Sequence, residues 1–284
     1  MKAAGLGDLS LDILIALKTQ DVTPEYVRAM RDLGLHLDAE KLIAMRVQGI
    51  DPEYVRATRD SGLNPTEDQL IALKVQDVDA AYYRDLKKAG IDPDLDRLIA
   101  MKVQGVTPEY VNELRATGLN LTVDQVIGLK VQDVTPKYVN ELRAAGLTVT
   151  ADKVIALKVQ DVTPEYLKGL RDQGLDASAD SAIAMRVQDV TPEYVKAIRA
   201  LGLNPSANQF IAMRVQDVTP EYIKGLQAAG FKLDINDIIG AKVQDVTPEF
   251  IESARRHGFK DLTLQKLIQL RQLGILDSDT KTDI

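Results

Sequence analysis

Apolar side chains recur along the chain with the spacing of short amphipathic helices, and the pattern returns every 28 residues. One copy begins with VTPEYV at 22–27 and continues as a helical pattern to Gly34. A second pattern, written LIALKVQ at 70–76, ends at Asp or Gly in every copy that carries it. Each copy therefore predicts two short helices joined by turns.

Start and stop signals frame the first helix of each copy. Thr23 is a favourable N-cap, Pro24 fits the first helical position, and Glu25 places negative charge near the positive end of the helix dipole. Gly34 can adopt the positive φ that ends a helix. Thr or Asp and then Gly recur at these places, so the same boundaries are predicted throughout.

An aromatic residue keeps this register through nine copies. Because one pair of short helices cannot bury enough apolar surface alone, the copies must stack on one another. We predict an all-α fold, an elongated, superhelical α-solenoid of nine to ten units over residues 1–275, with a polar tail at 276–284. The aromatic series is Tyr26, Tyr54, Tyr82, Tyr110, Tyr138, Tyr166, Tyr194, Tyr222 and Phe250.

Each second helix carries an isoleucine, such as Ile43, and in all but the last it is followed by a small residue that would let neighbouring helices approach closely. In the last helix the small residue is replaced by Gln269. At the two ends the pattern becomes more polar, because Thr19 and Gln272 stand where the inner copies have valine. Exposed ends of a solenoid require polar residues. We therefore predict end caps near 1–22 and 259–275.

Composition restricts the function classes. The 284 residues are 45% hydrophobic and 27% charged, and the net charge of −7 disfavours nucleic acid as a partner. The sequence contains no Cys, no membrane-spanning apolar run and no visible signal peptide, so we expect a soluble protein without membrane insertion, with the cytoplasm favoured. The two histidines, His36 and His257, lie far apart, and no catalytic, cofactor-binding or metal-binding motif is found. No enzyme activity and no cofactor are predicted.

Glutamine is the strongest recurrent polar feature of the second helices. An amide both donates and accepts hydrogen bonds, so a ladder of amides could hold an extended peptide, as the asparagine ladder of armadillo repeats does. Alternatively, each amide bonds to its own neighbours inside the protein, which the near-identity of the copies favours. The candidate peptide- or protein-binding glutamines are Gln48, Gln76, Gln104, Gln132, Gln160, Gln188, Gln216 and Gln244.

A cation precedes each of these glutamines by two positions. These cations could bind acidic ligands, but the last turn of a helix favours a cation in any case. Glutamates begin the next helix nearby, and Arg31, Arg59 and Arg115 are expected near Asp68, Asp96 and Asp124, so both edges of the array should be roughly neutral. Four cations are kept as candidate binding residues: Lys102, Lys130, Lys158 and Arg186.

Three further features leave alternatives open. The tyrosines form either a stacking platform or mostly buried rings with satisfied hydroxyls. The polar residues after the stop glycines vary most, as His36, Asn64 and Asp176 show, and either read a ligand one unit at a time or are unconstrained surface. Tyr83, in VDAAYY at 78–83, marks either a local contact point or sequence drift.

The unit VTPEYV, a helix to Gly and then LIALKVQ, resembles a bacterial 28-residue helical repeat. That repeat occurs in segments appended to membrane-bound zinc metallopeptidases of the beta-lactam-sensor type. The resemblance covers residues 10–275 and includes none of the peptidase or membrane parts. It implies a sensing or scaffolding appendage.

We expect a non-enzymatic scaffold that binds a protein or peptide along the inner face of the second helices. A structural spacer or a sensor appendage of a larger protein is the alternative. A repeat-coded nucleic-acid binder is a further hypothesis, which the net charge disfavours. The sequence predicts neither the identity of the ligand nor the oligomeric state.

Overall fold

The computed structural model describes residue 1, residues 4–175 and residues 178–276. In this part the chain is all-helical, and pairs of nine-residue helices return about every 28 residues, which confirms the predicted α-solenoid fold. Asp176 and nearly all of the predicted tail lie outside the described residues. The helices are α1 (Leu11–Thr19), α2 (Pro24–Asp32), α3 (Ala39–Val47), α4 (Pro52–Asp60), α5 (Glu67–Val75), α6 (Ala80–Lys88), α7 (Leu95–Val103), α8 (Pro108–Ala116), α9 (Val123–Val131), α10 (Pro136–Ala144), α11 (Ala151–Val159), α12 (Pro164–Asp172), α13 (Ala179–Val187), α14 (Pro192–Ala200), α15 (Ala207–Val215), α16 (Pro220–Ala228), α17 (Ile235–Val243), α18 (Pro248–Arg256) and α19 (Leu264–Gln272).

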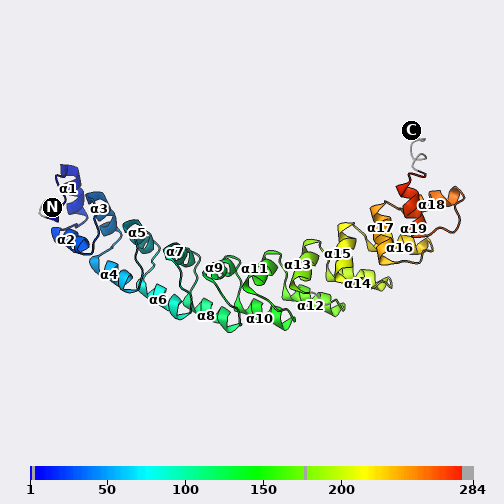
Figure 1. Cartoon of the computed structure of the whole chain (residues 1–284), viewed down its shortest axis with the longest axis horizontal. Helices are drawn as coiled ribbons and strands as arrows, with labels where there is room; N and C mark the ends of the chain where they lie inside the picture. The colour runs from blue at the N-terminus through cyan, green and yellow to red at the C-terminus, as the bar shows by residue number, and fades with distance from the viewer. Residues whose placement is uncertain (2–3, 176–177, 277–284) are drawn as a thin grey trace. The chain divides into compact units, whose positions relative to one another are not determined.

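The chain divides into two compact units, the first made of residues 1–136 with 150–152 and the second of residues 137–149 with 153 onward. In each unit the odd-numbered helices form one layer and the even-numbered helices form the other (Figure 1). Apolar side chains between the layers form the core. Met45 in the first unit and Met213 in the second have no exposed surface.

The helix ends form as predicted. The hydroxyl of Thr23 accepts a hydrogen bond from the backbone N–H of Tyr26 at 3.2 Å, and Pro24 is the first residue of α2. The residue after each odd helix and its C-cap adopts the left-handed conformation, with φ of 68° at Gly49 and 53° at Asp189. Aspartate can fill this place because it tolerates left-handed backbone better than most residues.

In the eight copies that carry a tyrosine, this residue joins one repeat to the next. The hydroxyl of Tyr26 donates a 2.7 Å hydrogen bond to the carbonyl of Ile50, 24 residues further on. The rings are buried or half-buried, which confirms the hypothesis of buried tyrosines with satisfied hydroxyls. The same bond is made by Tyr54, Tyr82, Tyr110, Tyr138, Tyr166, Tyr194 and Tyr222.

Arginines in the last turns of even helices form a second contact between neighbouring repeats. Arg115 Nη2 donates to the backbone carbonyl of Gly90 at 2.9 Å. A Cβ atom on Gly90, whose φ is +83°, would lie 2.5 Å from Arg115 Nη1. Glycine at this place therefore both ends its helix and admits the arginine of the next repeat.

The carboxylates expected beside these arginines pair elsewhere. Asp68 pairs with Lys41 and Asp124 with Arg97, at 2.5 Å and 2.7 Å, and both pairs link neighbouring odd helices. Among the described residues, no ion pair joins Arg31, Arg59 or Arg115 to these carboxylates. Backbone carbonyls are instead the acceptors of Arg31, Arg59 and Arg115.

Odd helices approach closely at their small residue. A Cβ atom on Gly240 of α17 would lie 3.2 Å from Cδ1 of Ile268 in α19, which leaves little room for any larger side chain. The predicted role of the small residue beside the isoleucine is confirmed at this contact.

The first helix, α1, exposes apolar side chains. Leu11 and Ile15 are 72% and 55% exposed. The valines of the inner repeats are exposed as well, so the positions of Thr19 and Gln272 face solvent in the inner repeats too. None of the described helices approaches the roughly 20 apolar residues that a helix needs to span a bilayer.

Candidate functional site

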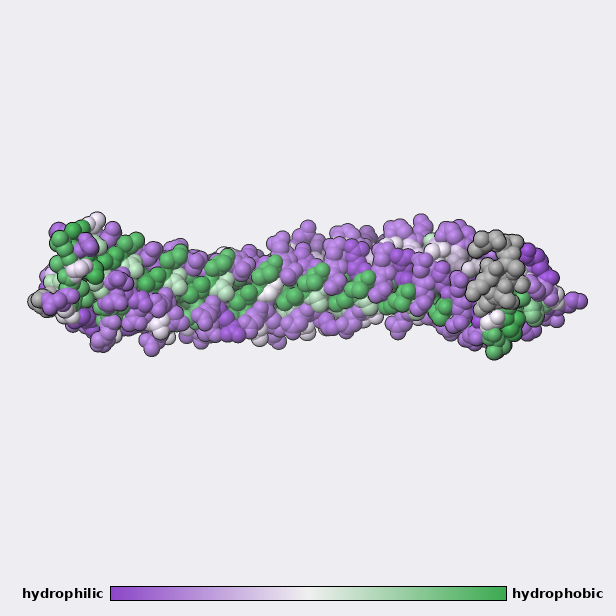
Figure 2. Space-filling model, turned by 90° about the horizontal axis from the view of Figure 1, so that it is seen from above, coloured by the Kyte–Doolittle hydropathy of each residue, from purple (hydrophilic) through white to green (hydrophobic). Residues whose placement is uncertain are grey.

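One valine of each inner repeat projects into solvent from the last position of its odd helix. Their exposed fractions lie between 52% and 56%. At about 100° per residue, Val47 lies about 140° around α3 from the buried Leu42 and about 160° from Met45, so it faces away from the core. Figure 2 shows hydrophobic patches following one another along each unit, between hydrophilic borders.

A glutamine follows each valine as the C-cap of the same helix. The backbone N–H of Gln48 donates to the carbonyl of Ala44 at 3.1 Å, which leaves its side-chain amide free for other partners. We call these residues together the valine–glutamine face. In the first unit it comprises Val47, Gln48, Val75, Gln76, Val103, Gln104, Val131 and Gln132, and in the second Val159, Gln160, Val187, Gln188, Val215, Gln216, Val243 and Gln244.

The glutamine amides have no hydrogen-bond partner among the residues that the structure describes. The side-chain hydrogen bonds of glutamine occur instead at other positions, as in the capping box of Thr66 and Gln69. All glutamines of the face are exposed or half-exposed. The hypothesis that they bond their own neighbours therefore receives no support, and their amides are available to a ligand.

The recurrent cations, in contrast, are engaged inside the protein. Each lies over the aromatic ring of the preceding repeat; Lys102 Nζ, for example, is 5.0 Å from the centroid of Tyr82. Lys102 Nζ also lies 3.7 Å from Oδ2 of Asp77, the residue with left-handed backbone after α5. The other candidate cations lie over rings in the same way: Lys130 over Tyr110, Lys158 over Tyr138 and Arg186 over Tyr166.

These contacts assign the cations an internal role. Arg186 Nη2 lies 2.7 Å from Asp161 Oδ2, so its charge is balanced by the carboxylate that ends the previous odd helix. In two repeats a glycine, Gly49 or Gly105, replaces the aspartate after the odd helix. Lys74 and Lys130, which lie beside these glycines, still stack on the rings of Tyr54 and Tyr110. We do not include the cations in the valine–glutamine face.

Carboxylates form one border of the face in the first unit. They occupy the second position of each odd helix, seven residues before the valine and thus two turns away on the same side. All of them are exposed. They are Glu40, Asp68, Asp96 and Asp124, of which Asp68 and Asp124 are ion-paired.

The tyrosines are held away from water. Burial raises the pKa of Tyr166 to about 12; Arg186 lowers the pKa and Asp189 raises it by smaller amounts. A neutral hydroxyl that is already donating to a backbone carbonyl offers no general base and no free stacking surface.

The other sequence candidates have simple explanations. Tyr83 is buried, and its hydroxyl donates to Asp92 Oδ1 at 2.7 Å while Lys87 lies over its ring, so it is engaged locally. His36 and Asn64 are exposed on loops, where the structure assigns them no partner among the described residues.

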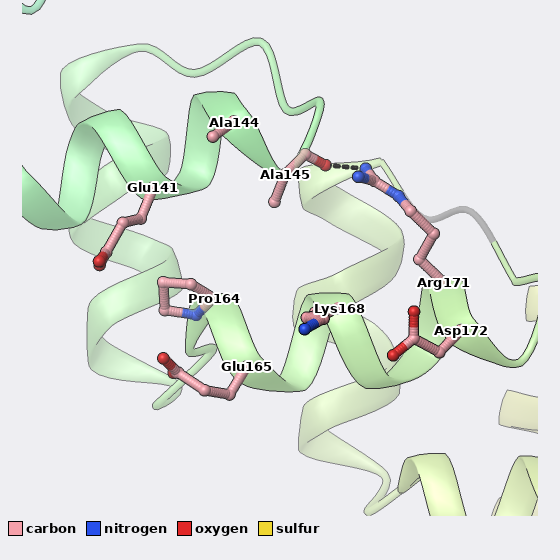
Figure 3. Close-up of a pocket in the computed structure, with 8 residues that line it drawn as sticks. All are labelled: Glu141, Ala144, Ala145, Pro164, Glu165, Lys168, Arg171 and Asp172. Atoms are coloured by element: carbon pink, nitrogen blue, oxygen red, sulfur yellow. Dashed lines mark hydrogen bonds between the residues drawn. The ribbon is translucent and has the colours of Figure 1, made fainter.

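A cleft of about 530 Å³ lies between α10 and α12 on the even-helix layer (Figure 3). Glu141 occupies the place that Gly169 fills one repeat later, where a Cβ atom would already lie 2.7 Å from Pro192. Glu141 and Pro164 both line the cleft. Its lining mixes Lys168 with exposed carboxylates and brings no nucleophile and base together.

Among the described residues, no cluster of His, Asp or Glu side chains could hold a metal ion. Comparison with protein-family models and with curated proteins finds no match to this chain. The valine–glutamine face is therefore judged on its geometry alone. Sequence analysis identified its glutamines but missed its valines, although helical spacing from Leu42 and Met45 could have shown that Val47 points outward.

Proposed function

We propose that this protein is a non-enzymatic repeat scaffold that binds a polypeptide along the valine–glutamine face. The observation that carries the proposal is that each inner repeat exposes one valine beside one amide without a partner among the described residues. Contiguous exposed apolar surface bordered by polar residues is typical of interaction sites. A free amide next to it supplies both a donor and an acceptor for a peptide backbone.

Selection from a random peptide library displayed on phage tests this function. The full chain is the target, beside a first-face variant (Val75→Thr, Val103→Thr, Val131→Thr) and a second-face variant (Val187→Thr, Val215→Thr, Val243→Thr). Threonine keeps the β-branched shape and removes apolar surface. A control variant carries Asn112→Ala and Asn120→Ala, which are exposed outside the face.

We expect peptides that bind the wild type and the control and that lose binding to at least one face variant. Peptides that bind all variants equally would place the site elsewhere. If no peptide is enriched on any correctly folded chain, the alternative function, a structural spacer or sensor appendage, replaces the proposed one.

A further inference from the structure

The spacing of the face selects among ligand conformations, given the function proposed above. Successive odd helices are in contact in the first unit, as α5 with α7 and α7 with α9 show, and packed helices lie roughly 8–10 Å apart. The face therefore presents one valine and one amide about every 9 Å. A ligand that uses every repeat must return equivalent groups to the same side with this period.

A β-strand does not have this period. Its side chains return to the same side after two residues, or roughly 6.6–6.8 Å, and the third residue points to the opposite side. A polyproline II helix has three residues per turn and rises about 3.1 Å per residue, so equivalent side chains recur after about 9.3 Å. Only the polyproline II segment keeps one side chain in step with every odd helix.

The free amides argue in the same direction. An α-helical ligand has its backbone N–H and C=O groups bonded internally, so it would offer the glutamines no backbone partner. The backbone of a polyproline II helix makes no internal hydrogen bonds. Each amide therefore meets one turn of the ligand. The backbone carbonyls of that turn are unpaired, and so are its N–H groups at residues other than proline.

Charge indicates the sign of the ligand. The first unit, residues 1–136 and 150–152, contains 16 Lys and Arg against 23 Asp and Glu, so it accounts for the whole net charge of −7. Glu40, Asp68, Asp96 and Asp124 border its valines; Asp68 and Asp124 are ion-paired with Lys41 and Arg97, and Glu40 and Asp96 have no ion pair among the described residues. The cations on the other side stack on tyrosines. A cationic ligand complements this surface, and an acidic one is repelled.

We propose that the valine–glutamine face of the first unit binds a polyproline II segment of another polypeptide, with an apolar side chain at every third position and cationic side chains between. The apolar side chains contact Val75, Val103 and Val131, and the adjacent amides bond the ligand backbone. Glu40 and Asp96, the border carboxylates without an ion pair among the described residues, receive the cations.

Synthetic peptides test this inference by titration against the full chain. The probe has five Ile-Pro-Lys triplets. An isomer of the same composition carries Ile at every second position over its first ten residues, a third peptide replaces Lys with Glu, and a fourth repeats Ile in a helical heptad. We expect the triplet peptide to bind at least tenfold more tightly than each of the others, with an affinity that falls as salt is added.

The first-face variant should weaken binding of the triplet peptide at least tenfold, and the Asn112→Ala, Asn120→Ala control should leave it unchanged. Equal binding of the isomer or of the heptad peptide overturns the polyproline II assignment and leaves the scaffold function standing. Equal binding of the Glu peptide overturns the charge assignment. If no triplet peptide binds while phage selection yields face-dependent peptides without a three-residue period, only this inference fails; if selection yields none either, both fail.

Discussion

The tyrosine of each repeat is the residue whose environment the structure defines most fully. Its hydroxyl donates to a carbonyl in the next repeat, and a cation lies over its ring, as for Tyr166, Val190 and Arg186. The hydrogen bond requires the protonated hydroxyl, whereas Arg186 lowers the pKa of Tyr166 by less than burial raises it. The residue therefore links packing between repeats to protonation.

We expect stability to fall as the pH rises from about 10 to about 12. Tyrosine in the unfolded chain ionises near pH 10, whereas the pKa of Tyr166 in the folded chain is about 12. Above pH 10 the unfolded state therefore binds fewer protons than the folded state, so the free energy of unfolding decreases. Urea unfolding at several pH values measures this slope.

Tyr166→Phe provides the matched comparison. It should cost about 1 kcal/mol at pH 8, because it removes one hydrogen bond between repeats, and it should also make the alkaline loss of stability smaller. An unchanged alkaline slope in the variant would show that Tyr166 does not contribute to it.

The glutamines of the face should behave in the opposite way. Replacing Gln104, Gln132, Gln160 and Gln188 together with Ala should change stability by no more than about 0.5 kcal/mol per site, because the amides have no partner among the described residues. Thermal melts beside wild type decide this. A large loss of melting temperature would mean that the amides do hold the repeats together.

Sequence analysis predicted the helix boundaries well because caps and stops are local. Thr23, Pro24 and Gly34 act within a single turn, so their residue types determine their roles. The partners of long side chains depend on how one repeat packs on the next. For that reason the sequence did not predict that Arg31 and Arg115 donate to backbone carbonyls, and the free amide of Gln104 stayed an open alternative.

At the scale of helices, close packing depends on the small residue of the odd helices. Gly240 is one of two glycines at a position that is otherwise alanine in the inner repeats. The 3.2 Å separation from Ile268 sets a limit on side-chain size at this contact.

Gly240→Ala should stabilise the second unit by up to about 1 kcal/mol, because glycine is unfavourable within a helix and alanine is accommodated in other repeats. Gly240→Leu should destabilise it by about 1–3 kcal/mol through overpacking against α19. Denaturant midpoints of the two variants measure both effects. Equal stability of the Leu and Ala variants would mean that the helices separate easily at this contact.

For the whole molecule, the repeat of two helices is the unit of stability. The tyrosine bond spans 24 residues and runs from an even helix to the loop that follows the next odd helix, as from Tyr166 to Val190. In such arrays each repeat contributes its own stability and its interfaces with neighbours. Removal of a complete repeat should therefore preserve the tyrosine hydrogen bonds between the remaining repeats.

Deletion of residues 191–218 removes one 28-residue repeat and should leave a chain that still unfolds cooperatively, with helix content lower in proportion. Deletion of residues 205–218 removes α15 alone. It should cost far more, because Tyr194 loses the carbonyl of Val218 and two even helices follow one another. Circular dichroism melts compare the two, and equal stability would show that single helices are independent.

The hydrogen bond from each tyrosine to the next repeat has a consequence for the evolution of the chain. The eight copies that carry the tyrosine use the same hydroxyl donor and the same backbone acceptor position, so any of them can follow any other without a new kind of contact. Phe250 of the ninth copy has no hydroxyl to donate. Unequal recombination between copies that preserves the 28-residue register would lengthen or shorten the chain and still yield a foldable product. Each such event would add or remove one valine and one amide, so the polyproline II ligand proposed above would lengthen or shorten by about three residues at a time.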